Sequence, residues 1–257
     1  MHNIRCAAPT MAAMLSVPAF TEVSYIPEVL EKTGGAADRV LMYNPDAVAW
    51  WIFEKYHALF EPILDDSLVL QMESVMPSVT PVCFASIYSG LMPADHGIRS
   101  YTKPVLTCET IFDALIKAGK KPVICSTGTD SISMIFRERD MEYYIFDTPD
   151  EVNAKAEELI RLNRHDLIVV YNGNYDGTMH RYGPEAEESL EALRHNIAAY
   201  GHLTAMAEEV WGKAGLRYAA GFVTDHGCHE IDGGCGSHGL DMAEDMNVVH
   251  LWRTNRK

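Results

Sequence analysis

The sequence has no long hydrophobic run, no cysteine framework and no excess of positive charge. No stretch of about eighteen consecutive apolar residues occurs, so we expect no transmembrane helix. The formal net charge is −15, from 21 basic and 36 acidic residues. A field of this sign repels long polyanions and acidic membrane surfaces, so neither a nucleic-acid polymer nor a membrane is expected as a partner. Small anionic substrates stay allowed, because a bound metal ion reverses the charge locally.

The six cysteines are scattered along 257 residues without the spacing of a disulfide framework. This pattern favours a reducing compartment. The first twenty residues contain one arginine and a weak apolar patch interrupted by Pro9 and Pro18, which makes a poor signal peptide. We therefore expect a cytoplasmic protein.

Short β-branched runs alternate with longer amphipathic segments along the chain. Strands are expected at 39–44, 67–73, 121–126, 166–171, 220–224 and 247–252, and helices at 47–60, 81–89, 109–118, 150–162 and 184–213. This alternation predicts an α/β fold with a mostly parallel central sheet and helices on both faces. The length favours one domain over residues 1–257, in which residues 1–35 form an N-terminal arm.

Carboxylates, amides and imidazoles follow three of the expected strands. In chain order these residues are Asp46, Asn172, Asn174, Asp176, His180, Asp225 and His226, with His238 twelve residues after His226. In parallel sheets ligands bind beyond the carboxyl ends of strands. Carboxylate oxygens and neutral imidazole nitrogens are ligands that zinc accepts. Asp46 alone reads equally well as a helix N-cap.

Thr80 is followed by Pro81 at the start of an expected helix. A hydroxyl in this position most often caps the helix. It also stands at the positive end of the helix dipole, where anions bind. A catalytic role and a capping role both remain open at this point.

Four segments occur in an order that resembles a known family: TPVCFASIYSGLMPADHGI, DGTMHRYGP, TDHG and GSHG. Together, from about residue 46 to residue 238, they resemble the alkaline phosphatase superfamily, in its type I phosphodiesterase/nucleotide pyrophosphatase branch. The resemblance implies an alkaline-phosphatase-like fold without a large cap insertion. It implies a metal-dependent phosphodiesterase or nucleotide pyrophosphatase that acts on a small phosphorylated substrate.

The resemblance also implies a site with two divalent metal ions, expected to be Zn²⁺. One ion would be held by Asp176, His180 and His238. The other would be held by Asp46, Asp225 and His226, with the Thr80 oxygen as a further ligand. Thr80 would be the nucleophile and would form a phospho-threonine intermediate, and two metals suit the in-line displacement of a phosphoryl group.

The sequence departs from the family pattern at three places. Asp46 stands in N-P-D-A, where the family has a D-G context, and Cys83 replaces an asparagine that binds phosphate. The remaining candidates for substrate binding are Tyr101, Lys103, Asn172 and Asn174, although each also fits a loop or surface position. The short connection from His226 to His238 predicts an active site that is open or is completed by a partner subunit, so a homo-oligomer is compatible with the sequence.

Other interpretations use the same residues. Within the enzyme class, the alternatives are a phosphomonoesterase and a phosphonate (C–P) hydrolase. A sulfatase is disfavoured, because no C-x-P-x-R string surrounds Thr80. Outside the enzyme class, the alternative is an inactive metal-binding scaffold. A structural zinc knot from Cys228, His229, Cys235 and His238 is a poorer interpretation, because the gap between its cysteines exceeds the usual two to four residues.

Overall fold

The computed structural model describes residues 1–255, and its centre is an eight-stranded sheet in the order β1-β3-β10-β7-β2-β6-β4-β5. The strands are β1 (His2–Asn3), β2 (Arg39–Pro45), β3 (Leu68–Glu73), β4 (Pro122–Thr127), β5 (Glu142–Phe146), β6 (Leu167–Asn172), β7 (Tyr218–Val223) and β10 (Asn247–Thr254). Strand β10 is antiparallel to its neighbours β3 and β7, and the other adjacent pairs are parallel. The expected α/β fold with a mostly parallel sheet is confirmed.

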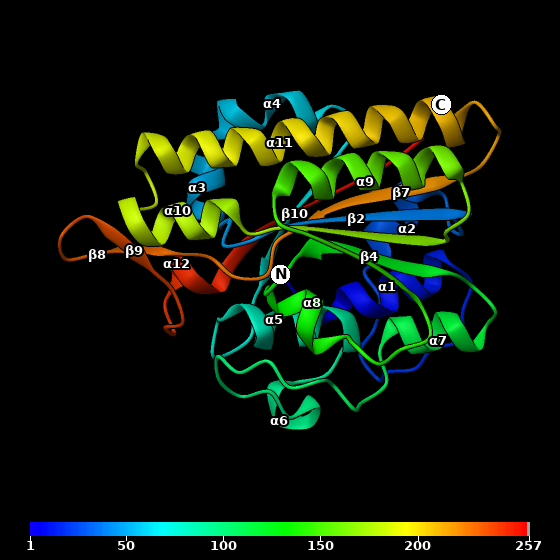
Figure 1. Ribbon diagram of the computed structural model, residues 1–257, viewed down its shortest axis with the longest axis horizontal. Helices are drawn as coiled ribbons and strands as arrows, with labels where there is room; N and C mark the ends of the chain where they lie inside the picture. The colour runs from blue at the N-terminus through cyan, green and yellow to red at the C-terminus, as the bar shows by residue number, and fades with distance from the viewer. Residues whose placement is uncertain (256–257) are drawn as a thin grey trace.

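Helices cover both faces of this sheet (Figure 1). One layer contains α3 (Trp50–Lys55), α4 (His57–Leu64), α9 (Pro149–Leu162), α10 (Asn174–Tyr182) and α11 (Glu187–Ala207). The other contains α1 (Ala7–Met14), α5 (Thr80–Ser89), α6 (Pro93–His96), α7 (Ile111–Lys117) and α8 (Ser131–Ile135). Helix α2 (Pro27–Thr33) packs against β10 and α1.

Alternate side chains of the central strands enter opposite cores. In β2, Val40 and Met42 pack into the core on the α1 and α5 side, whereas Leu41 and Tyr43 pack into the core under α9 and α11. Because successive residues of a strand point to opposite faces, a strand covered on both faces is apolar throughout. This explains why β6, with the sequence LIVVYN, is buried at every position.

Several element boundaries differ from expectation. The helix expected at 47–60 is two helices, because the backbone at Tyr56 leaves the helical region with φ −110°. The helix expected at 184–213 is α11, which begins only at Glu187 and passes at Glu208 into a single π turn, Glu208–Gly212. Strand β5 was not expected, because the edge sequence EYYIF shows no alternation of apolar and polar residues.

Residues 1–35, set apart above as an arm, contain β1, a 3-10 turn, α1 and α2. The weak apolar patch is helix α1, whose Ala7, Met11 and Met14 are fully buried in the core beside α5 and α7. All six cysteines are free thiols. No helix within residues 1–255 is both long and apolar enough to cross a bilayer.

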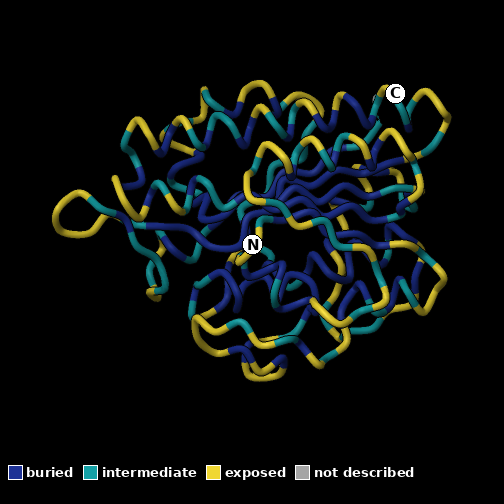
Figure 2. Tube along the Cα trace, in the orientation of Figure 1, coloured by how far each residue is buried: buried dark blue, intermediate teal, exposed yellow. Residues whose placement is uncertain are grey.

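The carboxyl ends of the parallel strands lie at one edge of the sheet, on the left in Figure 1. At this edge stand α10, the two-stranded hairpin of β8 (His229–Ile231) and β9 (Cys235–Ser237), and α12 (Ala243–Met246). Figure 2 shows the strands buried along their length and the hairpin tip exposed. Loops that leave this edge can therefore bring side chains from several strands together.

Candidate metal centre

The residues implied as metal ligands converge at the carboxyl edge of the sheet. Asp46 follows β2 directly, and Asp225 and His226 follow β7. His238 follows β9 of the hairpin. The segment after β6, expected only as a strand end, is helix α10, which places Asp176 and His180 four residues apart on one face.

One group of ligand atoms lies around the imidazole of His226. Its Nε2 atom is 3.3 Å from Oδ1 of Asp46 and 3.3 Å from Oδ2 of Asp225. The hydroxyl oxygen of Thr80 lies 3.2 Å from the same nitrogen. All four residues are buried. Carboxylate, imidazole and hydroxyl groups from three separate parts of the chain thus face one point.

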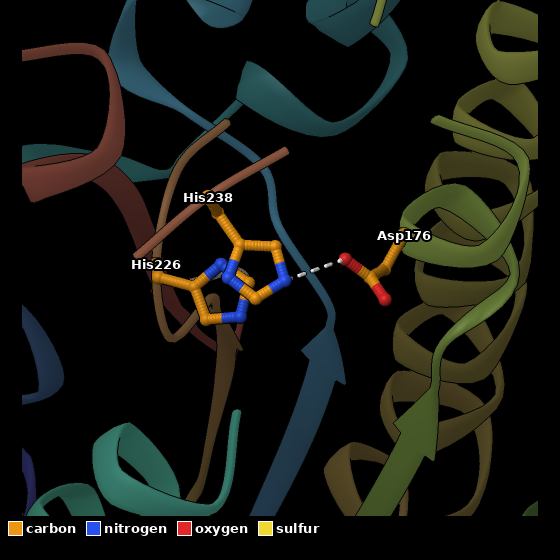
Figure 3. A group of neighbouring side chains, drawn as sticks. All are labelled: Asp176, His226 and His238. Atoms are coloured by element: carbon orange, nitrogen blue, oxygen red, sulfur yellow. Dashed lines mark ion pairs between the residues drawn. The ribbon is translucent and has the colours of Figure 1, made fainter. Parts of the chain in front are cut away.

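A second group adjoins the first. Nε2 of His180 lies 3.3 Å from Oδ1 of Asp176, and Nε2 of His238 lies 3.5 Å from the same oxygen. The two Nε2 atoms are 3.1 Å apart. Figure 3 shows His238 facing Asp176, with the ring of His226 stacked beside it at a centroid distance of 3.9 Å. His226 is close enough to Asp176 and His238 to belong to both groups.

The other ring nitrogen of each histidine is held by the backbone. Nδ1 lies 2.9 Å from the carbonyl oxygen of Gly227 in His226, 3.0 Å from that of Gly236 in His180, and 2.9 Å from that of Ser78 in His238. A carbonyl only accepts, so Nδ1 carries the proton and the neutral ring leaves a lone pair on Nε2. These lone pairs face carboxylate oxygens and each other, an arrangement that a cation stabilises. Backbone partners of this kind orient metal-binding histidines in proteins.

The carboxylates show the same preparation for a cation. Oδ1 of Asp46, Oδ1 of Asp176 and Oδ2 of Asp225 are buried and have no hydrogen-bond partner. The second oxygens of Asp46 and Asp225 accept hydrogen bonds from the Tyr171 hydroxyl and the Ala47 N–H. Burying an unpartnered polar atom costs free energy, and a bound cation removes that cost. The donor set of oxygen and imidazole nitrogen fits two divalent ions such as Zn²⁺.

Burial shifts the titration of these groups away from their ordinary ranges. It raises the pKa of Asp225 to about 8. Burial, together with the charges of Asp225 and Asp176, raises the pKa of Asp46 well above its ordinary value. The pKa of His226 is lowered by burial to about 3. Without a cation Asp225 therefore retains a proton near neutral pH and His226 stays neutral, whereas the neighbouring histidines lower the pKa of Asp176; binding of a cation to Asp225 would be coupled to proton release.

The backbone at Ala47 explains why Asp46 occurs in N-P-D-A. Ala47 has φ +65° and is fully buried. This left-handed conformation is the one that glycine adopts at lowest cost, which matches the D-G context of the family. The alanine adopts it nonetheless, and its N–H then lies 3.3 Å from Oδ1 of Asp225.

Thr80 does not act as a cap in this structure. Helix α5 begins at Thr80 with Val79 in the cap position, and no side chain makes a capping hydrogen bond there. The threonine hydroxyl instead faces Nε2 of His226. The capping role left open above is therefore wrong, and the hydroxyl is free to take part in chemistry.

A pocket of about 290 Å³ opens beside these groups. Thr80, Asp46 and Asp176 line one side, and Tyr101, Lys103 and Asn174, expected as substrate-binding residues, also line it. The ammonium group of Lys103 is 2.8 Å from the carbonyl oxygen of Thr129. The sequence did not single out the other polar residues of the wall, which come from the end of β4 and the segment after it, the segment after β5, and β6: Thr127, Asp130, Ser131, Asp147 and Tyr171.

Two expected substrate-binding residues face the interior instead. Cys83 is fully buried, and its thiol lies 3.3 Å from the Ser74 hydroxyl. The Asn172 amide donates to the Tyr43 hydroxyl at 2.8 Å and to Asn153 at 3.0 Å. Neither side chain lines the pocket. The Cys83 thiol packs in the core beside Ser74, and the Asn172 amide bonds to Asn153 of α9. The structure thus gives neither a contact with substrate.

The structural zinc knot finds no support in the geometry. His229 donates to Asp245 at 2.7 Å, and the Cys235 thiol lies against the carbonyl oxygen of Arg181. Among residues 1–255 the two clusters of close metal-ligand atoms are Asp46, Asp225 and His226, and Asp176, His226 and His238; neither contains a cysteine, and His180 lies beside the second. His238 therefore belongs with Asp176 rather than with the cysteines.

Comparisons with known proteins support the fold. No family model and no curated protein sequence matches the chain. Murine ectonucleotide pyrophosphatase/phosphodiesterase 5, solved as an inactive threonine-to-alanine variant in complex with AMP, matches with a TM-score of 0.63 at 13% identity, over 84% of this chain and 88% of that chain. The human protein matches with a TM-score of 0.63 at 13% identity, over 84% and 87%.

A second kind of enzyme shares the same architecture. The C-terminal periplasmic domain of phosphoethanolamine transferase EptC from Campylobacter jejuni matches with a TM-score of 0.60 at 11% identity, over 85% of this chain and 80% of that chain. These neighbours belong to the alkaline phosphatase superfamily. The chain therefore has an alkaline-phosphatase-like fold, as the order of its motifs indicated.

Proposed function

We propose that the protein is a metal-dependent phosphoester hydrolase, and specifically a phosphodiesterase of the nucleotide pyrophosphatase type. One observation carries this proposal: buried carboxylate oxygens without partners and imidazole lone pairs converge beside the Thr80 hydroxyl at the head of α5. The structural neighbours, a nucleotide pyrophosphatase/phosphodiesterase and a phosphoethanolamine transferase, act on phosphoesters and support the reaction class.

The residues divide into two ligand sets in this proposal. Asp46, Asp225 and His226 would hold one ion together with the Thr80 oxygen, and Asp176, His180 and His238 would hold the other. Two bound divalent ions supply positive charge that stabilises the attacking and leaving oxygens of a phosphoryl displacement. Zn²⁺ is the ion that this donor set favours.

The chain itself positions the nucleophile. Thr80 is 3% exposed and lies at the pocket wall, so its oxygen meets a substrate that enters from the pocket and little bulk water. Attack of this oxygen on the phosphorus of a diester, with loss of the hydroxyl proton, would form a Thr80 O–P bond and break the bond to the leaving group, which departs with a proton. Water would then cleave the Thr80 O–P bond, restore the hydroxyl and release a phosphate monoester. Tyr101, Lys103 and Asn174 stand where the organic part of the substrate would lie.

Turnover of model substrates with defined metal content tests the proposal. Protein freed of metal with a chelator and reloaded with zinc should hydrolyse a p-nitrophenyl phosphodiester, and the chelated protein should not. Faster hydrolysis of p-nitrophenyl phosphate would identify a phosphomonoesterase instead, and cleavage of a phosphonate C–P bond would identify the third hydrolase alternative. A folded, zinc-loaded protein that cleaves none of these substrates would be a metal-binding scaffold.

Substitution of Thr80 tests its role in the same assay. Thr80→Ala should lower turnover about a thousandfold or more while zinc stays bound, because three side-chain ligands remain for each ion. Thr80→Ser retains the oxygen and should keep part of the activity. Thr110→Ala is the matched control, because Thr110 caps α7 through a capping box with Asp113, and its loss should cost about 0.5–2 kcal/mol of stability without loss of turnover. Full activity in Thr80→Ala would contradict the mechanism.

A further inference from the structure

Tyr171 lies in β6, directly under the metal centre, and takes no part in the two ligand sets. Tyr171 is 3% exposed, and its hydroxyl donates a hydrogen bond to Oδ2 of Asp46. Asp46 itself is 1% exposed, so this phenol is its partner in a site from which water is largely excluded. The bond joins the end of β6 to the end of β2, its neighbour in the sheet.

The bond leaves the two oxygens of Asp46 in different states. Oδ2 is occupied by the Tyr171 hydroxyl, whereas Oδ1 has no hydrogen-bond partner and lies 3.3 Å from Nε2 of His226. Asp225 shows the same division, with Oδ1 bonded to the Ala47 N–H and Oδ2 unpartnered and facing His226. Each carboxylate thus presents one oxygen to the same point, and a separate protein donor holds the other.

An aromatic contact holds the Tyr171 phenol in this place, and a neighbouring glycine leaves room for it. The ring of Phe84, from the buried helix α5 that begins at Thr80, meets the Tyr171 ring edge-on at a centroid distance of 5.5 Å. On the other side is Gly173, where an added Cβ would lie 2.7 Å from the Tyr171 hydroxyl oxygen. Such a distance is shorter than real Cβ contacts, so any larger residue at position 173 displaces the phenol.

We infer that Tyr171 is a positioning residue that fixes Asp46 as a one-oxygen ligand of the ion shared with Asp225, His226 and Thr80. The inference rests on the proposed function, because it requires that this ion binds. Outer hydrogen bonds to ligating carboxylates orient them, and their loss typically weakens metal binding 10- to 100-fold. The Asp176, His180 and His238 set has no contact with the Tyr171 hydroxyl among the described hydrogen bonds, so its affinity should not change.

Zinc titration of the metal-free protein against a chromophoric chelator tests the inference. Wild-type protein should bind two ions, and Asp225→Asn should identify which binding step belongs to the Asp46 set. Tyr171→Phe removes only the hydroxyl and should weaken that step 10- to 100-fold while the other step stays unchanged. Tyr200→Phe is the control, since it removes another buried hydroxyl, bonded to the Ala220 carbonyl at 3.2 Å, and both steps should remain as in wild type.

A second variant guards against a general folding defect in Tyr171→Phe. Gly173→Ala keeps the tyrosine and displaces its hydroxyl, so it should weaken the same step. Gly201→Ala is its control, because an added Cβ there meets only Ile63 at an ordinary 3.4 Å. The inference is wrong if Tyr171→Phe and Gly173→Ala bind zinc at both steps as tightly as wild type does, or if they lose the same affinity at both steps. Either result leaves the proposed function standing. A wild-type protein that binds no zinc overturns the proposed function, and this inference with it.

Discussion

Removing metal from the protein should make its stability fall as pH rises above neutrality, and Asp225→Asn should abolish part of that fall. Asp225 has a pKa of about 8 in the metal-free native state because it is buried, whereas an aspartate in the unfolded chain titrates near 4. Between these values the native state holds a proton that the unfolded state has lost. Stability is therefore lost as pH rises, until the native carboxyl also ionises.

The magnitude follows from the proton occupancy. About nine-tenths of native molecules hold this proton at pH 7 and about half at pH 8, which gives a loss of about 1 kcal/mol over that interval. Groups such as His226, whose pKa is lowered to about 3, oppose the trend only below pH 6.5, where an unfolded histidine binds protons. His226 therefore contributes little between pH 7 and pH 8, and comparison of wild type with Asp225→Asn isolates the Asp225 carboxyl from other groups that titrate there.

Urea unfolding followed by circular dichroism, in a chelating buffer at pH 7 and pH 8, measures this difference. Asp225→Asn cannot ionise but retains an oxygen for the Ala47 N–H, so its free energy of unfolding should fall about 1 kcal/mol less than that of wild type. Excess zinc should stabilise the wild type, by about 2.7 kcal/mol at a hundred times its dissociation constant, and more at pH 8 than at pH 6. Parallel pH profiles for wild type and Asp225→Asn in the absence of metal would refute the reasoning.

Three further predictions concern the backbone and the ligands. Ala47 has φ +65°, a conformation that β-branched residues rarely adopt. Ala47→Gly should therefore retain activity, whereas Ala47→Val should lower the melting temperature and the zinc affinity. Equal melting temperatures for the two variants would contradict this. Gly227→Ala should destabilise the protein by about 1–3 kcal/mol in urea unfolding, because an added Cβ would lie 1.9 Å from the Glu244 carbonyl oxygen; Gly201→Ala is its control. His180→Ala should reduce bound zinc from two ions to one by elemental analysis, and retention of both would exclude His180 as a ligand.

The sequence predicted the sheet and the strand ends well because the relevant signals are local. Buried parallel strands such as β2 and β6 read as continuous apolar runs, and ligands gather where such strands end. The order of the motifs indicated a resemblance to the alkaline phosphatase superfamily, and the fold comparison supports that resemblance. Asp46, Asp176 and Asp225 could be placed at one edge on this basis.

The parts that the sequence did not predict depend on tertiary contacts. Helix α10 was missed because Asn174, Gly177 and Gly183 resemble a loop, although the four-residue spacing of Asp176 and His180 was a usable helical signal. Nothing in the sequence distinguished Tyr171 from an ordinary residue at the end of an apolar strand. The interior positions of Cys83 and Asn172 depend on Ser74 and Tyr43, which are remote from the site motifs.

The β8–β9 hairpin offers a place where chain length can change without disturbing the candidate metal centre. Residues 230–234 at its tip are exposed, whereas its base is fixed: Gly236 in β9 accepts from His180, and His238 is held by the Ser78 carbonyl. Exposed turns tolerate added residues, and longer loops add little entropic cost. A binding module inserted between Asp232 and Gly233 would lie near His180 and His238 while these two histidines keep their backbone partners. The compact chain is in this sense a minimal scaffold, on which new substrate selectivity can be built by insertion rather than by substitution.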